Sequence, residues 1–149
     1  MQKIDVTIAK LRLLLADVTA KEAQYTAVRQ QFRDQLRKAV EYSIYGDSSL
    51  DGTLGLMAEI QQRITDAEGT LRDLDLIRKR AERELESLTL TRRIEAAKTE
   101  LQQLLNRQTE LEQAGTDGAE REELGAQIRE LRQQINEASE QAARTLGRR

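Results

Sequence analysis

The segment Gly46–Gly52, with the sequence GDSSLDG, decides how this chain folds. It separates two long stretches that favour helix, and it is rich in glycine, aspartate and serine. Glycine reaches positive φ without strain, and Asp and Ser side chains accept hydrogen bonds from the free N–H groups at a helix start. We therefore predict a reversal over residues 46–52. A helix over about residues 3–45 folds back along a second helix that begins near residue 53, with Asp51 as its N-cap.

The composition is that of a long-helix protein. The 149 residues include no Pro, Cys, His or Trp, and 34% of them are charged. Proline normally interrupts helices, so its absence leaves only a few glycines to end them. The 3 Tyr and 1 Phe are too few for a compact globular core. The sequence therefore predicts an all-α fold of long antiparallel coiled-coil hairpins, forming a single elongated domain over residues 1–149.

Apolar residues in the first predicted helix recur at gaps of three or four, which places them on one helix face. The first part of this stripe keeps regular heptad spacing: Ile4, Ile8, Leu11, Leu15 and Val18. Glu22 then interrupts it. The stripe resumes at Tyr25, Val28, Phe32, Leu36 and Val40, where three successive gaps of four predict a stutter that locally unwinds the supercoil.

Two further helices follow the reversal. The second, over about residues 53–114, carries a stripe through Met57, Ile60, Ile64, Ala67, Leu71, Leu74, Ile77, Ala81, Leu85 and Leu88, resuming from Ile94 to Leu111. A second reversal is expected at residues 115–118, where Gly115 suits a helix end and Asp117 with Glu120 resembles a capping box. The third helix, over about residues 119–146, keeps strict four-three spacing at Leu124, Ile128, Leu131, Ile135, Ala138 and Ala142.

Helix lengths predict where three helices meet. At 1.5 Å per residue the second helix spans roughly 90 Å, while the first and third span roughly 65 and 40 Å, so neither covers the second alone. If both fold back, they overlap near residues 86–98. We expect a short three-helix core there, formed by Leu11, Leu14, Leu15, Leu85, Leu88 and Leu146. Because two-stranded rods bury little apolar surface per residue, we also expect self-association, with a dimer favoured.

The residue types restrict the chemistry. Without His or Cys the chain lacks the commonest general base, metal ligands and thiol nucleophile, so we expect neither an enzyme nor a cofactor. The lack of cysteine makes a reducing, cytoplasmic location the default expectation. No stretch is apolar for long enough to predict a membrane span. The net charge of −2, with both signs interspersed, argues against nucleic acid and does not favour an anionic membrane surface.

The first reversal resembles the start of an EF-hand calcium loop. Asp47, Ser49 and Asp51 stand at alternate positions and are followed by Gly52. Ala58 occupies the position where that family places its bidentate glutamate, with Glu59 one residue too late. The cluster also fits an ordinary capped turn, so these three residues are weak candidates for a metal site, and we expect no bound metal.

Large side chains gather around the same reversal. We call this end of the hairpin the tip. These side chains are Tyr42, Ile44, Tyr45, Leu50, Leu54, Leu56 and Met57. They exceed what one helix-helix contact needs. Two interpretations stay open: the residues plug the end of the hairpin, or they form an exposed apolar patch for a partner.

These observations predict a non-enzymatic helical interaction protein: an adaptor, scaffold or stalk component that binds an unidentified protein partner through its helix faces and the tip. The size and hairpin plan are similar in architecture to stalk and escort proteins of flagellar and type III secretion ATPases and to central-stalk subunits of rotary ATPases. A membrane-surface remodelling protein and a divalent-cation-responsive module using residues 46–58 are the alternatives.

Overall fold

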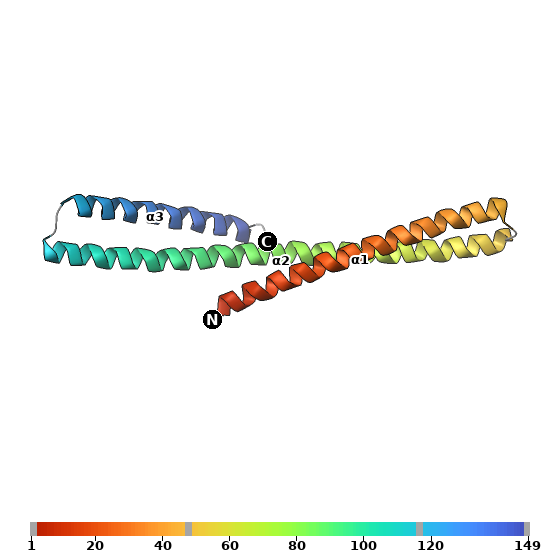
Figure 1. Ribbon diagram of the computed structural model, residues 1–149, viewed down its shortest axis with the longest axis horizontal. Coiled ribbons are helices and arrows are strands. Elements are labelled where there is room, and N and C mark those ends of the chain that lie inside the picture. Colours follow the sequence, from red (N-terminus) through yellow and green to blue (C-terminus); the bar gives the residue numbers. More distant parts are fainter. Residues whose placement is uncertain (1–2, 47–48, 116–117, 148–149) are drawn as a thin grey trace. The chain divides into compact units, whose positions relative to one another are not determined.

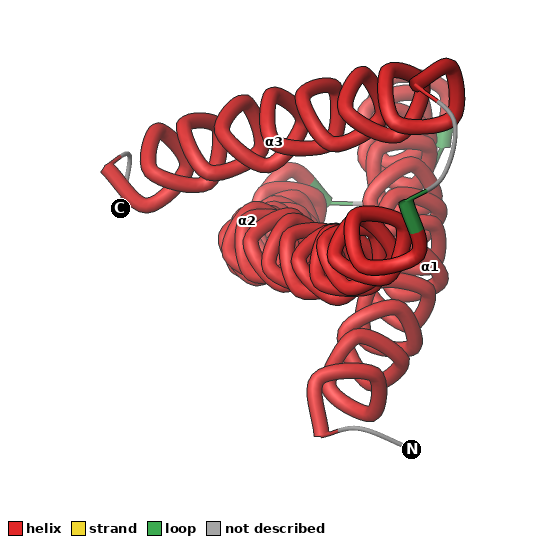
Figure 2. Tube along the Cα trace, turned by 90° about the vertical axis from the view of Figure 1, so that its left-hand side faces the viewer, coloured by secondary structure: helices red, strands yellow, loops and turns green. Residues whose placement is uncertain are grey.

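The computed structural model describes residues 3–46, 49–115 and 118–147, and within these ranges the protein is all-α. Its helices are α1 (Lys3–Tyr45), α2 (Leu50–Ala114) and α3 (Gly118–Gly147), shown in Figure 1. Figure 2 shows that loop separates the helices only at the two reversals. The predicted all-α class is confirmed, and each helix boundary lies within three residues of its prediction.

The helices fold into two compact units. The first unit, Lys10–Glu82, pairs most of α1 with the beginning of α2; the second unit combines residues 1–9 with residues 83–149. The expectation that residues 1–149 behave as a single domain stays a prediction. No described helix is long and apolar enough to cross a membrane.

In the first unit, α1 and α2 run antiparallel, as the orange and yellow ribbons of Figure 1 show. The ion pairs Glu22–Arg78 and Arg33–Glu68 join them, so facing residue numbers add up to about 100. The seam, meaning the line of residues that each helix turns toward the other, keeps strict four-three spacing and is buried or half-buried throughout. On α1 it comprises Val18, Glu22, Tyr25, Arg29, Phe32, Leu36, Ala39 and Ser43; on α2 it comprises Thr53, Met57, Ile60, Ile64, Ala67, Leu71, Leu74, Arg78 and Ala81.

This seam corrects two sequence predictions. Ala39 is 6% exposed whereas Val40 is 40% exposed, so the heptad continues through α1 and the predicted stutter at Val40 is wrong. On α2 the half-buried seam residue is Arg78, and Ile77 is 45% exposed. The regular repeat of the helix face, rather than the nearest apolar residue, decides which side chain faces the neighbouring helix.

In the second unit, α3 lies along the later part of α2, as the blue and cyan ribbons of Figure 1 show. The predicted stripe of α3 is confirmed: Leu124, Ile128, Leu131 and Ala138 are buried, and Ile135 and Ala142 are half-buried. Gly115 adopts a φ of 65° just after α2 ends, as expected of a glycine at a helix C-terminus. Asp117, the predicted cap of α3, lies outside the described residues.

The described residues of the predicted three-helix core are not fully buried. Leu14 is 41% exposed, so its predicted burial is wrong for the single chain, while Leu11, Leu15, Leu85 and Leu88 are half-buried and the side chain of Leu146 is not described. Leu11, Leu14 and Leu15 belong to the first unit and Leu85 and Leu88 to the second, so their meeting stays a prediction.

Besides the predicted stripe of α3, other residues of the second unit are buried. They are Ile8, 2% exposed, with Leu90 and Thr145. Asp5 and Arg92 pair at 3.1 Å (Oδ1 to Nε) and tie the start of α1 to α2. Between Glu84 and Leu90 only Glu86 is exposed, so α2 is covered over a wider arc there than a two-helix seam requires.

Candidate interaction surface

The tip is held by two short-range contacts. The Gly46 N–H donates to the Tyr42 carbonyl at 2.9 Å, and a Cβ at residue 46 would lie 2.6 Å from that oxygen, so the close approach requires glycine. On the other side, Ser49 Oγ accepts from the Gly52 N–H at 3.1 Å. Ser49 is therefore the N-cap of α2. The predicted cap, Asp51, lies within the first turn, because the helix begins three residues earlier than expected.

The large tip side chains are exposed rather than packed into a plug. Tyr45 is 87% exposed, Leu50 is 70% and Ile44 is 66% exposed. Tyr42, Leu54 and Leu56 are also exposed, and Met57 alone is half-buried. Of the two interpretations that the sequence leaves open, the single chain adopts the exposed patch.

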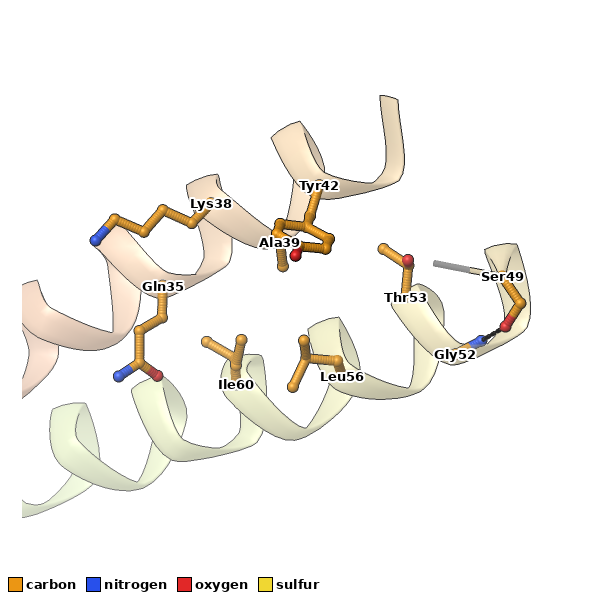
Figure 3. Close-up of a pocket in the computed structure, with 9 residues that line it drawn as sticks. All are labelled: Gln35, Lys38, Ala39, Tyr42, Ser49, Gly52, Thr53, Leu56 and Ile60. Carbon is orange, nitrogen blue, oxygen red and sulfur yellow. Dashed lines mark hydrogen bonds between the residues drawn. The ribbon is translucent and has the colours of Figure 1, made fainter. Parts of the chain in front are cut away.

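Small residues occupy the seam beside the tip. Near the tip the seam positions hold Ala39 and Thr53, which are 6% and 5% exposed. These small side chains leave an open groove of about 680 Å³ between the helices. Figure 3 shows Tyr42 from α1 and Leu56 from α2 directed into the space between the helices. The remaining lining residues are Gln35, Lys38, Ser49, Gly52 and Ile60.

The groove lies on one side of the first unit, which we call the open side. On each helix, the large apolar residues of this side are separated by a multiple of seven, so they share the repeat position beside the seam. They are Leu14, Val28 and Tyr42 on α1, and Leu56 and Ile77 on α2. Val28 is half-buried, and the other four are 41–65% exposed. In the middle of this side, the Arg63 guanidinium lies 5.7 Å from the centre of the Phe32 ring and pairs with Glu59 at 3.2 Å. The same repeat position also holds Lys21, Gln35, Arg63 and Thr70, so the apolar residues of the open side alternate with polar ones.

The opposite side of the seam, which we call the ion-paired side, is bridged by polar contacts within the chain. Arg33 Nη2 donates to Glu68 Oε1 at 3.2 Å, and Arg78 Nη2 donates to the Thr19 hydroxyl at 2.9 Å. Val40 and Leu54 are its exposed apolar residues near the tip. This side therefore satisfies much of its polar surface without a partner.

Within the seam, Arg78 and Glu22 form a part-buried ion pair. Arg78 Nε donates to Glu22 Oε1 at 2.8 Å, and its side chain is 25% exposed. The hydrogen bond that Arg78 donates to Glu22 raises the pKa of Arg78 above its ordinary value. A raised pKa means that the contribution of the charged arginine is present at all pH values below its ordinary pKa, and is lost only above it.

This pair was missed in the sequence, although the sequence held a signal for it. Glu22 occupies a seam position, where an unpaired carboxylate is costly to bury. A cation is therefore needed opposite, and Arg78 follows Leu74 by four residues in the regular repeat. Because the sequence prediction placed Ile77 in the seam, it left Arg78 outside the seam and did not pair it with Glu22.

Two of the three weak metal candidates lie within the described residues. Asp47 lies outside the described residues, Ser49 caps α2, and Asp51 is exposed. Within residues 3–46, 49–115 and 118–147 no group of three or more Asp, Glu, His or Cys side chains could hold a metal ion. Comparison of the chain with protein-family models, curated proteins and solved structures found no match.

Proposed function

We propose that this protein is a non-enzymatic helical interaction protein, acting as an adaptor, scaffold or stalk component that binds a protein partner through the tip. The observation that supports the proposal most is the gathering of apolar surface there. Of the twelve exposed large hydrophobic residues in the described ranges, seven lie between residues 40 and 56. Contiguous exposed apolar patches are rare on proteins without a binding partner, and tyrosine and methionine are enriched at interfaces.

Geometry favours a binding role for the outermost tip residues. Tyr45 is the last residue of α1 and Leu50 is the first of α2, and their side chains are 87% and 70% exposed. Truncation of such anchors at an interface typically costs about 1–4 kcal/mol of binding free energy. The same change should leave the folded state nearly unchanged, because exposed positions contribute little to stability.

Affinity capture tests the proposal. Purified wild type and a Tyr45→Ser/Leu50→Ser variant would be immobilised, exposed to extract of the source cells, and the captured proteins quantified by mass spectrometry. We expect a protein captured by wild type to be reduced at least about tenfold with the variant. Leu76→Ser is the matched control, because Leu76 is 66% exposed but lies away from the tip. Equal capture by wild type and the tip variant would contradict the proposal.

A further inference from the structure

The open side of the first unit is the surface that the chain leaves most incompletely covered. We propose that a second copy of this chain packs against it, with both tips pointing the same way, so that two hairpins form a four-helix bundle. The inference deepens the proposed function and rests on it, because it names one partner for one side of the same hairpin. It leaves Tyr45 and Leu50, which do not line the groove, for a different protein.

Sidedness is the first argument. The seam of the first unit keeps the seven-residue repeat throughout. Residues that share another position of this repeat therefore all lie on the same side of the helix pair. Pocket geometry confirms this at the tip, where Tyr42 of α1 and Leu56 of α2 line the same groove. Leu14 and Val28 share the repeat position of Tyr42, and Ile77 shares that of Leu56. The apolar residues therefore lie on one side of the helix pair, with Lys21 and Gln35 between them on α1 and Arg63 and Thr70 between them on α2.

Residue size is the second argument. In a two-helix hairpin that functions alone, large side chains are expected in the seam and small or polar ones outside it. Near the tip the order is reversed, since Ala39 and Thr53 are inside while Tyr42 and Leu56 are outside. In a four-helix bundle these outer positions become part of the core, and small residues in the original seam allow them to interdigitate.

Surface area is the third argument. The chain exposes 10852 Å², whereas a compact protein of 17.0 kDa exposes about 7,700 Å² by the usual scaling. None of the side chains that the structure describes is fully buried. The difference is about 3,000 Å² for one chain, and a permanent homodimer that buries on the order of 2,000–5,000 Å² in total takes about half of that area from each partner.

Charge decides the orientation. Asp17 and Lys38 on α1, and Glu59 and Arg80 on α2, occupy the exposed repeat position that flanks the open side, as Lys38 does at the groove. When a twofold axis parallel to the helices relates the two copies, α1 of one copy faces α2 of the other. Facing residues then lie at the same distance from the tip, which we call equal height. Lys38 then faces Glu59 of the second copy, and Asp17 faces Arg80. Both contacts occur twice, and both pair opposite charges.

The reversed orientation is less favourable. It brings each helix of one copy against the same helix of the other with heights inverted. Asp17 then faces Lys38 and Glu59 faces Arg80, so those pairs stay favourable, but Asp66 faces Asp73 of the second copy, again twice. With the tips aligned, those two aspartates face Gln31 and Gln24 instead. Only the aligned arrangement brings Tyr42 and Leu56 of both copies together over the groove, so charge and apolar contacts favour the same orientation.

Sedimentation equilibrium tests the self-association. We expect wild type to sediment at twice 17.0 kDa. Leu56→Ser should raise the dimer dissociation constant at least about tenfold, because it removes an apolar anchor from the interface. Leu54→Ser is the matched control: the residue type is the same, its exposure is 53% against 49%, and it lies on the ion-paired side. That variant should change the constant by less than about threefold.

Two outcomes would overturn the inference: wild type that sediments as a single chain up to about 100 μM, or a Leu54→Ser variant that weakens association as much as Leu56→Ser. Circular dichroism establishes that each variant is folded. Lys38→Glu is a second variant at an exposed position, and it should weaken the dimer while Lys38→Glu/Glu59→Lys restores it.

Disulfide trapping tests the orientation, and the absence of native cysteine makes it clean. A mixture of Tyr42→Cys and Leu56→Cys chains should form a covalent dimer under mild oxidation, since residue 42 of one copy faces residue 56 of the other at equal height. Cross-linking that requires a mixture of Tyr42→Cys and Leu14→Cys chains would instead establish the reversed orientation and overturn the proposed one.

The two proposals fail in different ways. A single-chain wild type whose captured partner is lost in Tyr45→Ser/Leu50→Ser would refute the second copy and leave the tip function intact. A dimer that depends on Leu56 but captures the same proteins with or without Tyr45 and Leu50 would refute tip binding and leave the second copy intact.

Discussion

The open side and the ion-paired side of the first unit are built by the same two helices and the same heptad, yet they differ in chemistry. On the ion-paired side, Arg33 reaches Glu68 across the helices, and Arg78 reaches Thr19. On the open side, Tyr42 and Leu56 stand beside a groove. This difference is the basis of our proposal that a second copy of the chain covers the open side.

Both sides depend on the seam, and the largest expected effect comes from breaking it. Ile60 is 5% exposed in the first unit. Ile60→Ala should lower the free energy of unfolding by about 2–4 kcal/mol, because buried methyl groups are lost and a cavity remains. Chemical denaturation followed by circular dichroism measures this. Leu56→Ala on the same helix, assayed at a concentration where the chain is monomeric, should lower it by less than about 0.5 kcal/mol. Equal losses would mean that Leu56 is a core residue and that the open side is wrongly identified.

Reversing one charge of the seam should have a smaller effect. Glu22→Lys places two cations at the same seam position and should lower the melting temperature, although less than Ile60→Ala does. Glu22→Lys/Arg78→Glu should recover most of that loss, since it restores an ion pair with reversed polarity. Thermal unfolding of the four proteins in this cycle gives the coupling. Additive effects would show that the two residues do not interact.

The smallest expected effect concerns the exposed contact of the ion-paired side. The Arg33 and Glu68 side chains are 49% and 35% exposed. Arg33→Ala should therefore lower the free energy of unfolding by only about 0.2–1 kcal/mol. The loss should shrink further at high salt, because ions screen exposed charges. A loss comparable to that of Ile60→Ala would mean that this side, rather than the seam, stabilises the hairpin.

Local patterns in the sequence were sufficient for the helices and the two reversals. Glycine and serine residues located the turns, and the α3 stripe was regular enough to be assigned in full. The seam of the first unit was harder, because Val40 and Ile77 are apolar and adjacent to the true seam residues Ala39 and Arg78. Choosing by hydrophobicity alone gave an apparent stutter, whereas the repeat itself places Ala39 and Arg78 inside.

Exposure at the tip could not be predicted from the same patterns. A plug and an exposed patch require the same residue types, and the choice between them depends on which side chains lie between the helices. Because Ala39 and Thr53 occupy those positions, the larger Tyr42 and Leu56 are displaced to the open side. That outcome follows from the register of the two helices, which only the three-dimensional arrangement fixes.

Hydroxyl-radical footprinting of the wild-type chain over a range of concentrations tests the central claim most directly. Leu54 and Leu56 are chemically identical, nearly equal in exposure, and lie on different sides of α2. If the open side is the surface that binds a second copy, oxidation of Leu56 falls as concentration rises while oxidation of Leu54 stays constant. Equal protection of both leucines, or protection of Leu54 alone, would contradict the account.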